Sequence, residues 1–207
     1  MNKLEQKKKQ KREALLIAAF SLFTSKGIHE TSVADITAEA HMAKGTFYLY
    51  FKDKYDLRDK LIVEHARNLF DKASVDLDKE ELNTLEDKVI FIADHVINEL
   101  NDNKILLRFI SKNLSWGVFH DMLVTGGEDD SGFTFYDGYR ALLEESGRKF
   151  RNPELMLYMI VELINSTCHN VILMQEPVKL EELKPELYGV ICDIIHRQEI
   201  ETEWETS

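Results

Sequence analysis

The sequence holds few residues that break helices or cross-link chains. Its 207 residues include three prolines, nine glycines and two cysteines. Sparse proline and glycine favour long helices, because both residues weaken a helix interior. The two cysteines, Cys168 and Cys192, are too few for a disulfide framework and fit a reducing cytosol, so we expect a cytoplasmic protein. Each is expected to be a small buried hydrophobic residue.

Segments typical of secreted and membrane proteins are also missing. The N-terminal residues, MNKLEQKKKQKR, are charged and lead into no apolar h-region, so we expect no secretory signal. The most apolar stretch, residues 155–174, is interrupted by Glu162, Asn165, His169 and Asn170. Polar residues at that density favour a buried helix over a membrane span.

Motifs of catalysis are scarce as well. The sequence has no Gly-rich phosphate loop, no Gly-x-Ser-x-Gly elbow and no Cys-x-x-Cys pair. The seven histidines are scattered. Adjacent residues on a helix point to different faces, so Cys168 and His169 do not suggest a shared metal or a nucleophile–base pair. The sequence therefore predicts neither an enzyme nor a bound metal or cofactor.

The charge is divided unevenly along the chain. Residues 1–60 hold twelve Lys and Arg against eight Asp and Glu and carry +4, and since the net charge is −11, the remaining residues carry −15. A basic head on an acidic body is typical of a protein that meets a polyanion at one end. Charge alone leaves open the alternative that the N-terminal lysines only solvate a frayed terminus.

Apolar periodicity predicts a first helix that ends near Gly27. Leu16, Ala19, Phe20 and Phe23 recur at the spacing of one helical face. Gly27 follows that pattern, where a helix end favours a left-handed residue.

A second and a third short helix are predicted next. Ser32 and Asp35 form a capping-box pattern with Asp in place of the commoner Glu. The residues HMA (41–43) form the expected turn, and KGTFYLYF (44–51) the third helix. Asp53 and Asp56 then predict the start of a fourth helix near Lys54.

The aromatic run in KGTFYLYFKDK has three possible structures: a buried strand, a base-stacking platform, or a short helix with two different faces. A strand requires alternation, which four aromatics in five positions do not give, and stacking platforms usually lie on sheets. On a helix, Phe47 and Phe51 share an inner face, whereas Lys44 and Tyr48 face outward. The sequence therefore favours a helix-turn-helix.

Three spaced motifs in residues 9–65 resemble the DNA-binding domain of the TetR family of transcriptional regulators. They are FTSKG, TSVADI and GTFYLYFKDK, which match the family's Phe-x-x-x-Gly, Thr-Ser-Val-x-x-Ile and Gly-x-x-Tyr-x-x-Phe-Lys patterns. Two positions depart from the family. His41 and Met42 replace a common Gly-Val in the turn, and Tyr50 replaces a common His. A left-handed His41 is acceptable, because His is among the residues enriched in that conformation.

The resemblance implies a set of DNA contacts. Ser32 and Val33, at the start of the second helix, would meet phosphates. The outward face of the third helix would enter the major groove, and further residues would contact the DNA backbone. The groove residues are Lys44, Gly45, Thr46, Tyr48 and Leu49, and the backbone residues are Tyr50, Lys52 and Lys54. The basic run KKKQKR would add sequence-independent attraction.

The rest of the chain is expected to be helical too, which makes the fold class all-α. The domains expected are a DNA-binding domain at 1–53, with the helix-turn-helix at about 32–51, and a helical regulatory, ligand-binding and dimerisation domain at 54–207. Helices are expected in residues 54–73, 84–100, 104–122, 133–146, 153–175 and 185–199, with Pro185 in a first helical turn.

Two apolar stripes follow the helical period near the C-terminus. They are Leu157, Ile160, Val161, Ile164, Cys168, Val171 and Ile172, and Leu187, Val190, Ile191 and Ile194. The residues alone leave open whether the stripes are intramolecular core. The resemblance implies that they pair with a second copy in a four-helix bundle. A dimer would place two recognition helices about 34–36 Å apart on a palindromic operator.

The middle of the chain offers candidates for an effector site. They are Phe91, His95, Phe109, Trp116, Phe119, Met122, Phe133, Tyr136, Met156, Met159 and Asn165. Most are expected to be ordinary core, yet apolar residues with a few polar groups also line ligand pockets. The charge of −15 favours a neutral or cationic apolar or aromatic ligand.

The sequence as a whole predicts a homodimeric DNA-binding regulator without a membrane segment, a repressor released from double-stranded DNA by a small molecule. Two alternatives remain open: a DNA-binding regulator without a ligand, and a helical enzyme with an accessory helix-turn-helix.

Overall fold

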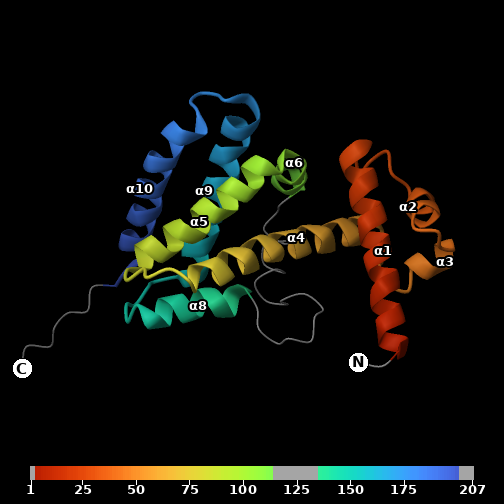
Figure 1. Cartoon of the computed structure of the whole chain (residues 1–207), viewed down its shortest axis with the longest axis horizontal. Coiled ribbons are helices and arrows are strands. Elements are labelled where there is room, and N and C mark those ends of the chain that lie inside the picture. Colours follow the sequence, from red (N-terminus) through yellow and green to blue (C-terminus); the bar gives the residue numbers. More distant parts are fainter. Residues whose placement is uncertain (1–2, 114–134, 201–207) are drawn as a thin grey trace, which may run out of the picture. The chain divides into compact units, whose positions relative to one another are not determined.

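The computed structural model describes residues 3–113 and 135–200, and every regular element in these ranges is a helix (Figure 1). An isolated antiparallel bridge joins Phe150 to Glu199. The expected all-helical class is confirmed.

The chain divides into two units, Met1–His65 and Ala66–Ser207. Helix α4 (Lys54–Leu77) has residues in both. The expected domain boundary, after residue 53, falls at the start of this helix. The first half of α4 belongs to the first unit, where Leu57 and Ile62 are fully buried and the His65 ring lies 4.6 Å from the Phe20 ring.

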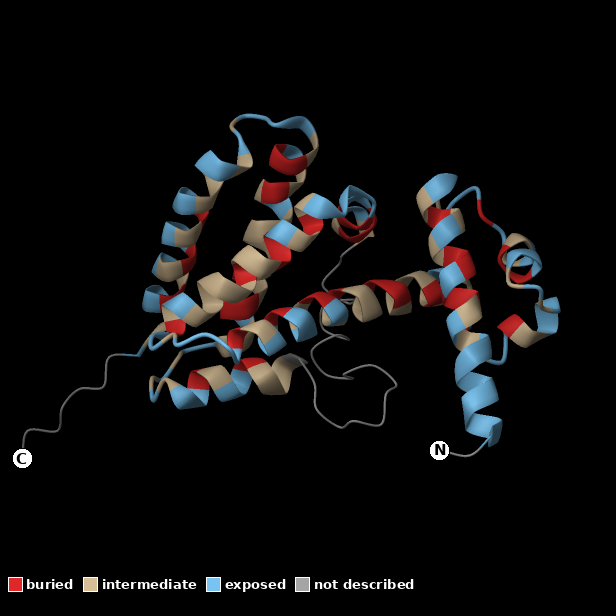
Figure 2. Ribbon diagram, in the orientation of Figure 1, coloured by how far each residue is buried: buried red, intermediate tan, exposed pale blue. Residues whose placement is uncertain are grey.

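The first unit also contains α1 (Lys3–Ser25), α2 (Val33–Glu39) and α3 (Lys44–Phe47). The apolar face expected on α1 is confirmed, because Leu16, Ala19 and Phe23 are buried there (Figure 2). Phe20 is half-buried. Helix α1 ends before Gly27, whose φ of 91° is the expected left-handed conformation.

The second unit contains the rest of α4 and five further described helices, which cover the described parts of the expected helical segments. They are α5 (Leu85–Asp102), α6 (Lys104–Asn113), α8 (Phe135–Glu145), α9 (Pro153–Met174) and α10 (Leu180–Gln198). Helices α9 and α10 lie side by side and both contact α5 (Figure 1). By length and composition alone α9 could cross a membrane, but it packs against α5, α6 and α10 as a core helix does.

A polar cluster fastens α10 to α5 near the start of α10. The ammonium of Lys184 donates to the Asp94 carboxylate at 2.6 Å, and the Tyr188 hydroxyl donates to the same oxygen. Asn98 donates to the other Asp94 oxygen at 2.8 Å. These bonds lower the pKa of Asp94 although burial alone would raise it.

A second cluster lies at the other end of α10. The Arg148 guanidinium donates to both carboxylate oxygens of Glu199, at 2.9 and 2.6 Å, and to Glu86 of α5 at 2.6 Å. Such bidentate pairs are geometrically specific. Together the two clusters fix α10 against α5 at both ends.

The position of Pro185 corrects one expectation. Helix α10 begins at Leu180, so Pro185 lies inside it and not in its first turn. The amides of Glu182 and Leu183 donate to the Lys179 carbonyl at 3.1 and 3.0 Å and close a turn before the proline. Acidic residues in that turn favour the helix N-terminus, which explains the earlier start.

The two apolar stripes are mostly intramolecular core, which corrects their assignment to a dimer interface. Seven of the eleven residues are buried within the single chain and cannot contact a partner: Leu157, Ile160, Cys168, Val171, Ile172, Leu187 and Ile191. The physical reason is that α9 and α10 turn these faces toward each other and toward α5 and α6. Val161, Ile164, Val190 and Ile194 keep exposed surface.

Candidate DNA-binding site

The start of α2 has the capping box that the sequence predicts. The Ser32 hydroxyl accepts from the Asp35 amide at 3.1 Å, and the Asp35 carboxylate accepts from the Ser32 amide at 2.8 Å. The Lys26 ammonium donates to the same carboxylate at 2.9 Å. The hydrogen bond from Lys26, followed by those from Ser32, lowers the pKa of Asp35 to about 2. The cap therefore holds Ser32 exposed at a fixed helix N-terminus, where an anion is favoured.

The turn between α2 and α3 contains a left-handed residue, a conformation that the sequence allows at His41 but does not require. His41 adopts a φ of 55°, and its amide donates to the Ala38 carbonyl at 3.1 Å. The Met42 amide donates to the Thr37 carbonyl at 2.8 Å. These bonds satisfy carbonyls at the end of α2, so His41 serves the turn in place of glycine.

Helix α3 is shorter than the predicted 44–51, because it ends at Phe47. The chain continues as a tight turn in which the amides of Tyr50 and Phe51 both donate to the Phe47 carbonyl at 3.0 Å. The Asp56 carboxylate then accepts from the Lys52 amide at 2.8 Å, and Asp53 caps α4 by accepting from the Asp56 amide at 2.9 Å. This second cap directs the chain into α4.

The two faces expected of residues 44–51 are confirmed. Phe47 and Phe51 are 0% and 2% exposed, with ring centroids 5.5 Å apart, whereas Tyr48 and Leu49 are 54% and 76% exposed. The buried rings anchor this segment to the unit. The Tyr48 ring rests edge-on against Phe47, with centroids 5.4 Å apart, and the exposed surface of Tyr48 and Leu49 is available to a partner.

Gly45 lies on the exposed side of α3. A Cβ built at this position meets no described atom within 4 Å. The fold therefore does not require glycine here. The missing side chain is explained if another molecule's backbone or base edges approach closely.

The predicted contact residues gather on α2, α3 and the turn after α3. Most are exposed, whereas Val33, Thr46 and Tyr50 are half-buried. The exposed ones in this group are Ser32, Lys44, Gly45, Tyr48, Leu49 and Lys52.

Lys54 has a structural role that sequence reasoning missed. Its ammonium donates to the carbonyls of Ile28, His29 and Thr31 at 2.9, 3.1 and 2.9 Å. A lysine has three donors, and all three are used. The expectation of a direct phosphate contact is therefore replaced by a positioning role: Lys54 holds the loop that leads into α2. No local pattern could have indicated this, because the partners lie more than twenty residues away.

The basic run KKKQKR is helical. Helix α1 begins at Lys3, and residues 3–11 are all exposed. At the end of the run, the Arg12 guanidinium lies 3.5 Å from Glu64 of α4 and 5.9 Å from the Phe51 ring. The lysines thus lie on the N-terminal part of α1, before Arg12 contacts Phe51 at the end of the turn after α3.

The predicted effector residues in the second unit are partly described. Trp116, Phe119, Met122 and Phe133 lie outside the described residues. Phe109 and Met156 are buried, and Phe91, His95, Tyr136, Met159 and Asn165 are half-buried.

His95 is the polar candidate with the most unusual surroundings. Its Nδ1 lies 3.7 Å from the Asp76 carboxylate, and its ring centroid lies 6.5 Å from that of Phe91. Its Nε2 is buried and has no hydrogen-bond partner in the described part of the chain. A buried ring nitrogen of this kind can bind a ligand.

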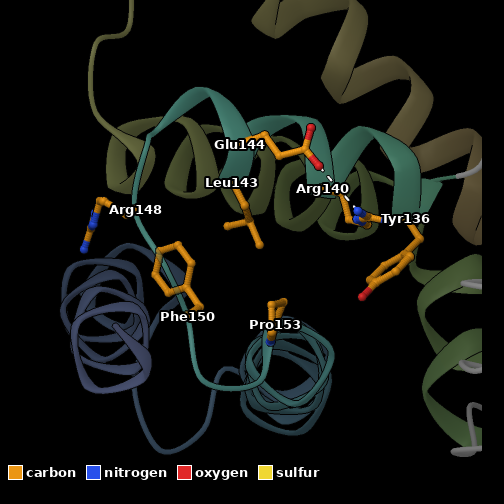
Figure 3. Close-up of a pocket in the computed structure, with 7 residues that line it drawn as sticks. All are labelled: Tyr136, Arg140, Leu143, Glu144, Arg148, Phe150 and Pro153. Atoms are coloured by element: carbon orange, nitrogen blue, oxygen red, sulfur yellow. Dashed lines mark hydrogen bonds and ion pairs between the residues drawn. The ribbon is translucent and has the colours of Figure 1, made fainter. Parts of the chain in front are cut away.

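A hollow of about 200 Å³ opens beside α8 (Figure 3). Of its lining residues, only Tyr136 was predicted to contact an effector. The hollow is lined by Tyr136, Arg140, Leu143, Glu144, Arg148, Phe150 and Pro153. Ligand pockets typically measure about 300–1,000 Å³, so this hollow is too small to be the enclosed site expected from the sequence.

Comparison with known proteins agrees with the geometry of the first unit. Residues 15–61 match the family described as bacterial regulatory proteins, tetR family. The fatty acid metabolism regulator protein of Bacillus subtilis is 31% identical over 88 residues, which are 42% of this chain and 45% of that protein. The chain therefore matches about half the length of this curated relative.

Solved structures share the whole fold. A protein from Shewanella sp. PV-4, assigned to the tetR family of transcription regulators, has a TM-score of 0.66 at 16% identity and covers 92% of this chain and 98% of its own. The transcriptional regulator FadR from Bacillus subtilis, solved with stearoyl-CoA, has a TM-score of 0.55 at 19% identity over 86% and 96% of the two chains. Residues 15–61 thus match the bacterial regulatory proteins of the tetR family, and the chain shares the fold of these solved structures.

Proposed function

We propose that the chain is a sequence-specific DNA-binding transcriptional regulator, a repressor that leaves its operator when a small apolar effector binds. The observation that carries the proposal is the opposite exposure of neighbouring side chains in the α3 segment. Phe47 and Phe51 are buried, while Lys44, Tyr48 and Leu49 point outward. A short helix anchored in this way can enter the major groove without disturbing the fold.

Each outward residue has a defined role in this proposal. Lys44 donates to guanine O6 and N7, and Leu49 offers apolar contact to a thymine methyl. Tyr48, Tyr50 and Lys52 contact phosphates, as do Ser32 and the amide of Val33 at the capped start of α2. Thr46 donates to a base or a phosphate.

The regulator is proposed to act as a homodimer. Val161 and Ile164 of α9, with Val190 and Ile194 of α10, keep apolar surface that a second copy would cover. Val190 is 45% exposed. A two-fold dimer would bind a palindromic operator with half-sites about 34–36 Å apart.

The effector is proposed to be a long-chain fatty acyl-CoA. The name of the Bacillus subtilis relative and the stearoyl-CoA in the solved FadR support this choice. Its acyl chain is apolar, as the sequence expects, but its phosphates are anionic, whereas the acidic second unit favours a neutral or cationic ligand. In this proposal, the negative charge of the second unit serves to keep DNA on the first unit.

A thermal-shift and DNA-release experiment tests the proposal. A ligand that binds only the folded state stabilises it by RT ln(1 + [L]/Kd), so Tm rises as the ligand concentration increases above Kd. Stearoyl-CoA is compared with stearate, lipophilic cations and neutral aromatics. Stabilisation and DNA release by stearoyl-CoA support the proposal. DNA binding that no ligand weakens would favour the alternative of a DNA-binding regulator without a ligand. Turnover of a ligand would favour the alternative of a helical enzyme with an accessory helix-turn-helix.

A further inference from the structure

Helix α6 carries three cations and no carboxylate. Lys104, Arg108 and Lys112 follow one another at intervals of four residues, which places them on one face of the helix. All three side chains are exposed, opposite the buried Leu107 and Ile110. Lys112 lies eight positions after Lys104, so the row is about 12 Å long.

These cations are unpaired within the described ranges, although the unit around them is acidic. Several cations elsewhere in the same unit do have carboxylate partners, among them Lys72, which pairs with Glu99 at 2.8 Å, and Lys88, which pairs with Glu145 at 2.7 Å. Lys104, by contrast, makes no ion pair with a described residue, although Asp102 ends the preceding helix. Residues 61–207 carry −15 in total, so an aligned row of unpaired cations is unusual in this acidic part of the chain. Such a row attracts an external anion with several negative charges.

The opposite face of α6 is apolar and belongs to the core of the second unit. Helix α6 contacts α9 and α5 through this face, where Phe109 is buried, as is Met156 of α9. Ile105 interrupts the cationic face and is 58% exposed. The inner face of α6 is therefore occupied by the core, and the surface that the helix leaves for a ligand consists of the three cations with Ile105 beside them.

We propose that Lys104, Arg108 and Lys112 form a phosphate-binding row for the headgroup of the CoA thioester. Lysine and arginine form charge-assisted hydrogen bonds with phosphate oxygens, and a row of three can contact more than one phosphate. The inference rests on the acyl-CoA effector proposed above. It adds the location of the headgroup and predicts that the phosphates, and not the acyl chain, select CoA thioesters over free fatty acids.

The test compares two triple variants of the full chain. The first is Lys104→Gln, Arg108→Gln and Lys112→Gln. The control is Lys149→Gln, Lys179→Gln and Arg197→Gln, which removes the same charge from three exposed residues of the same unit. Calorimetry measures the Kd for stearoyl-CoA and for stearate, and an operator titration measures DNA binding for each variant.

The α6 variant is expected to bind stearoyl-CoA about tenfold more weakly, because exposed ion pairs are individually weak and three are lost. It should bind stearate and DNA as the wild type does, and the control should bind all three normally. Equal weakening of stearoyl-CoA binding in both variants, or no weakening in either, would refute the assignment of these three residues to the headgroup. DNA binding lost only in the α6 variant would assign the row to DNA instead. A wild type that binds DNA but not stearoyl-CoA would refute the assignment to the headgroup, while the proposal of DNA recognition would stand.

Discussion

The Lys54 ammonium donates to the Thr31 carbonyl at 2.9 Å and so joins the start of α4 to the residue before the α2 cap. Thr31 is 1% exposed, and its hydroxyl donates to the Gly27 carbonyl at 2.8 Å. The loop that presents Ser32 is thus held from both sides. Its geometry depends on a side chain that belongs to another helix.

Replacing Lys54 should weaken DNA binding without removing a phosphate contact. Lys54→Met is expected to lower affinity for cognate and scrambled duplexes alike, while the slope of log K against log salt stays the same. Lys52→Met, the neighbouring control, should reduce that slope by about 0.9, the value for one lost phosphate contact. Hydrogen exchange at residues 28–32 should quicken in the free Lys54→Met protein only. An equal reduction of slope in both variants would restore Lys54 as a phosphate contact.

Lys44→Ala should relax base preference at one position of each half-site. A bidentate contact to guanine discriminates by about 1–3 kcal/mol. Titration of duplexes with each base at that position would measure the effect. If affinity drops equally for cognate and scrambled duplexes, Lys44 contacts a phosphate.

Gly45→Ala should leave the fold stable and impair DNA binding. Its added Cβ meets no described atom within 4 Å, so Tm should not fall. Alanine is moreover a better helix former than glycine. Thermal unfolding and operator titration on the same sample check both parts. Unchanged affinity would show that no part of the DNA approaches this position.

Acid should weaken the α2 cap over a defined pH range. The pKa of Asp35 is lowered from 3.8 to about 2 by Lys26 and Ser32. A lowered carboxyl pKa gives stability that is fully present above the unfolded value and is lost as pH falls toward the folded value. Wild type should therefore exceed Asp35→Asn in stability at pH 7, and the difference should shrink between about pH 4 and pH 2. Urea unfolding at several pH values measures it, and a difference that does not vary with pH would refute the assigned cause.

Charge at two neighbouring residues of α10 should have different effects. Ile191 is 0% exposed, so Ile191→Glu should unfold the protein by burying an unpaired charge. Val190→Glu should leave circular dichroism unchanged and shift sedimentation from dimer to monomer. Ile164→Glu, at a half-buried site, should disturb both. A Val190→Glu protein that stays dimeric would place the interface elsewhere.

Local patterns in the sequence predicted the caps and the buried face of the first unit, but neither the end of α3 nor the contacts of Lys54. The caps at Ser32 and Asp53 and the buried Phe47 and Phe51 all depend on residues a few positions apart. The stripes on α9 and α10 were recognised as apolar, but periodicity does not say whether the same chain or a partner covers a face.

Contacts between distant residues were beyond sequence reasoning. Lys54 with Ile28, and Arg148 with Glu86, join residues that no spacing rule relates. The unpaired row on α6 was also missed, because its significance depends on which cations elsewhere find carboxylates. Such features follow from tertiary packing, which overrides local preference.

The proposed function requires that the outward face of the α3 segment reads DNA sequence. The most direct measurement titrates wild type and the triple variant Lys44→Ala, Tyr48→Ala and Leu49→Ala against a duplex selected from a random pool and against its scrambled form. Wild type should prefer the selected duplex by at least about 10³-fold, as specific regulators do. The folded variant should lose that preference and keep only weak, salt-dependent binding. A variant that keeps the preference, or a wild type that has none, would show that this face does not read DNA sequence.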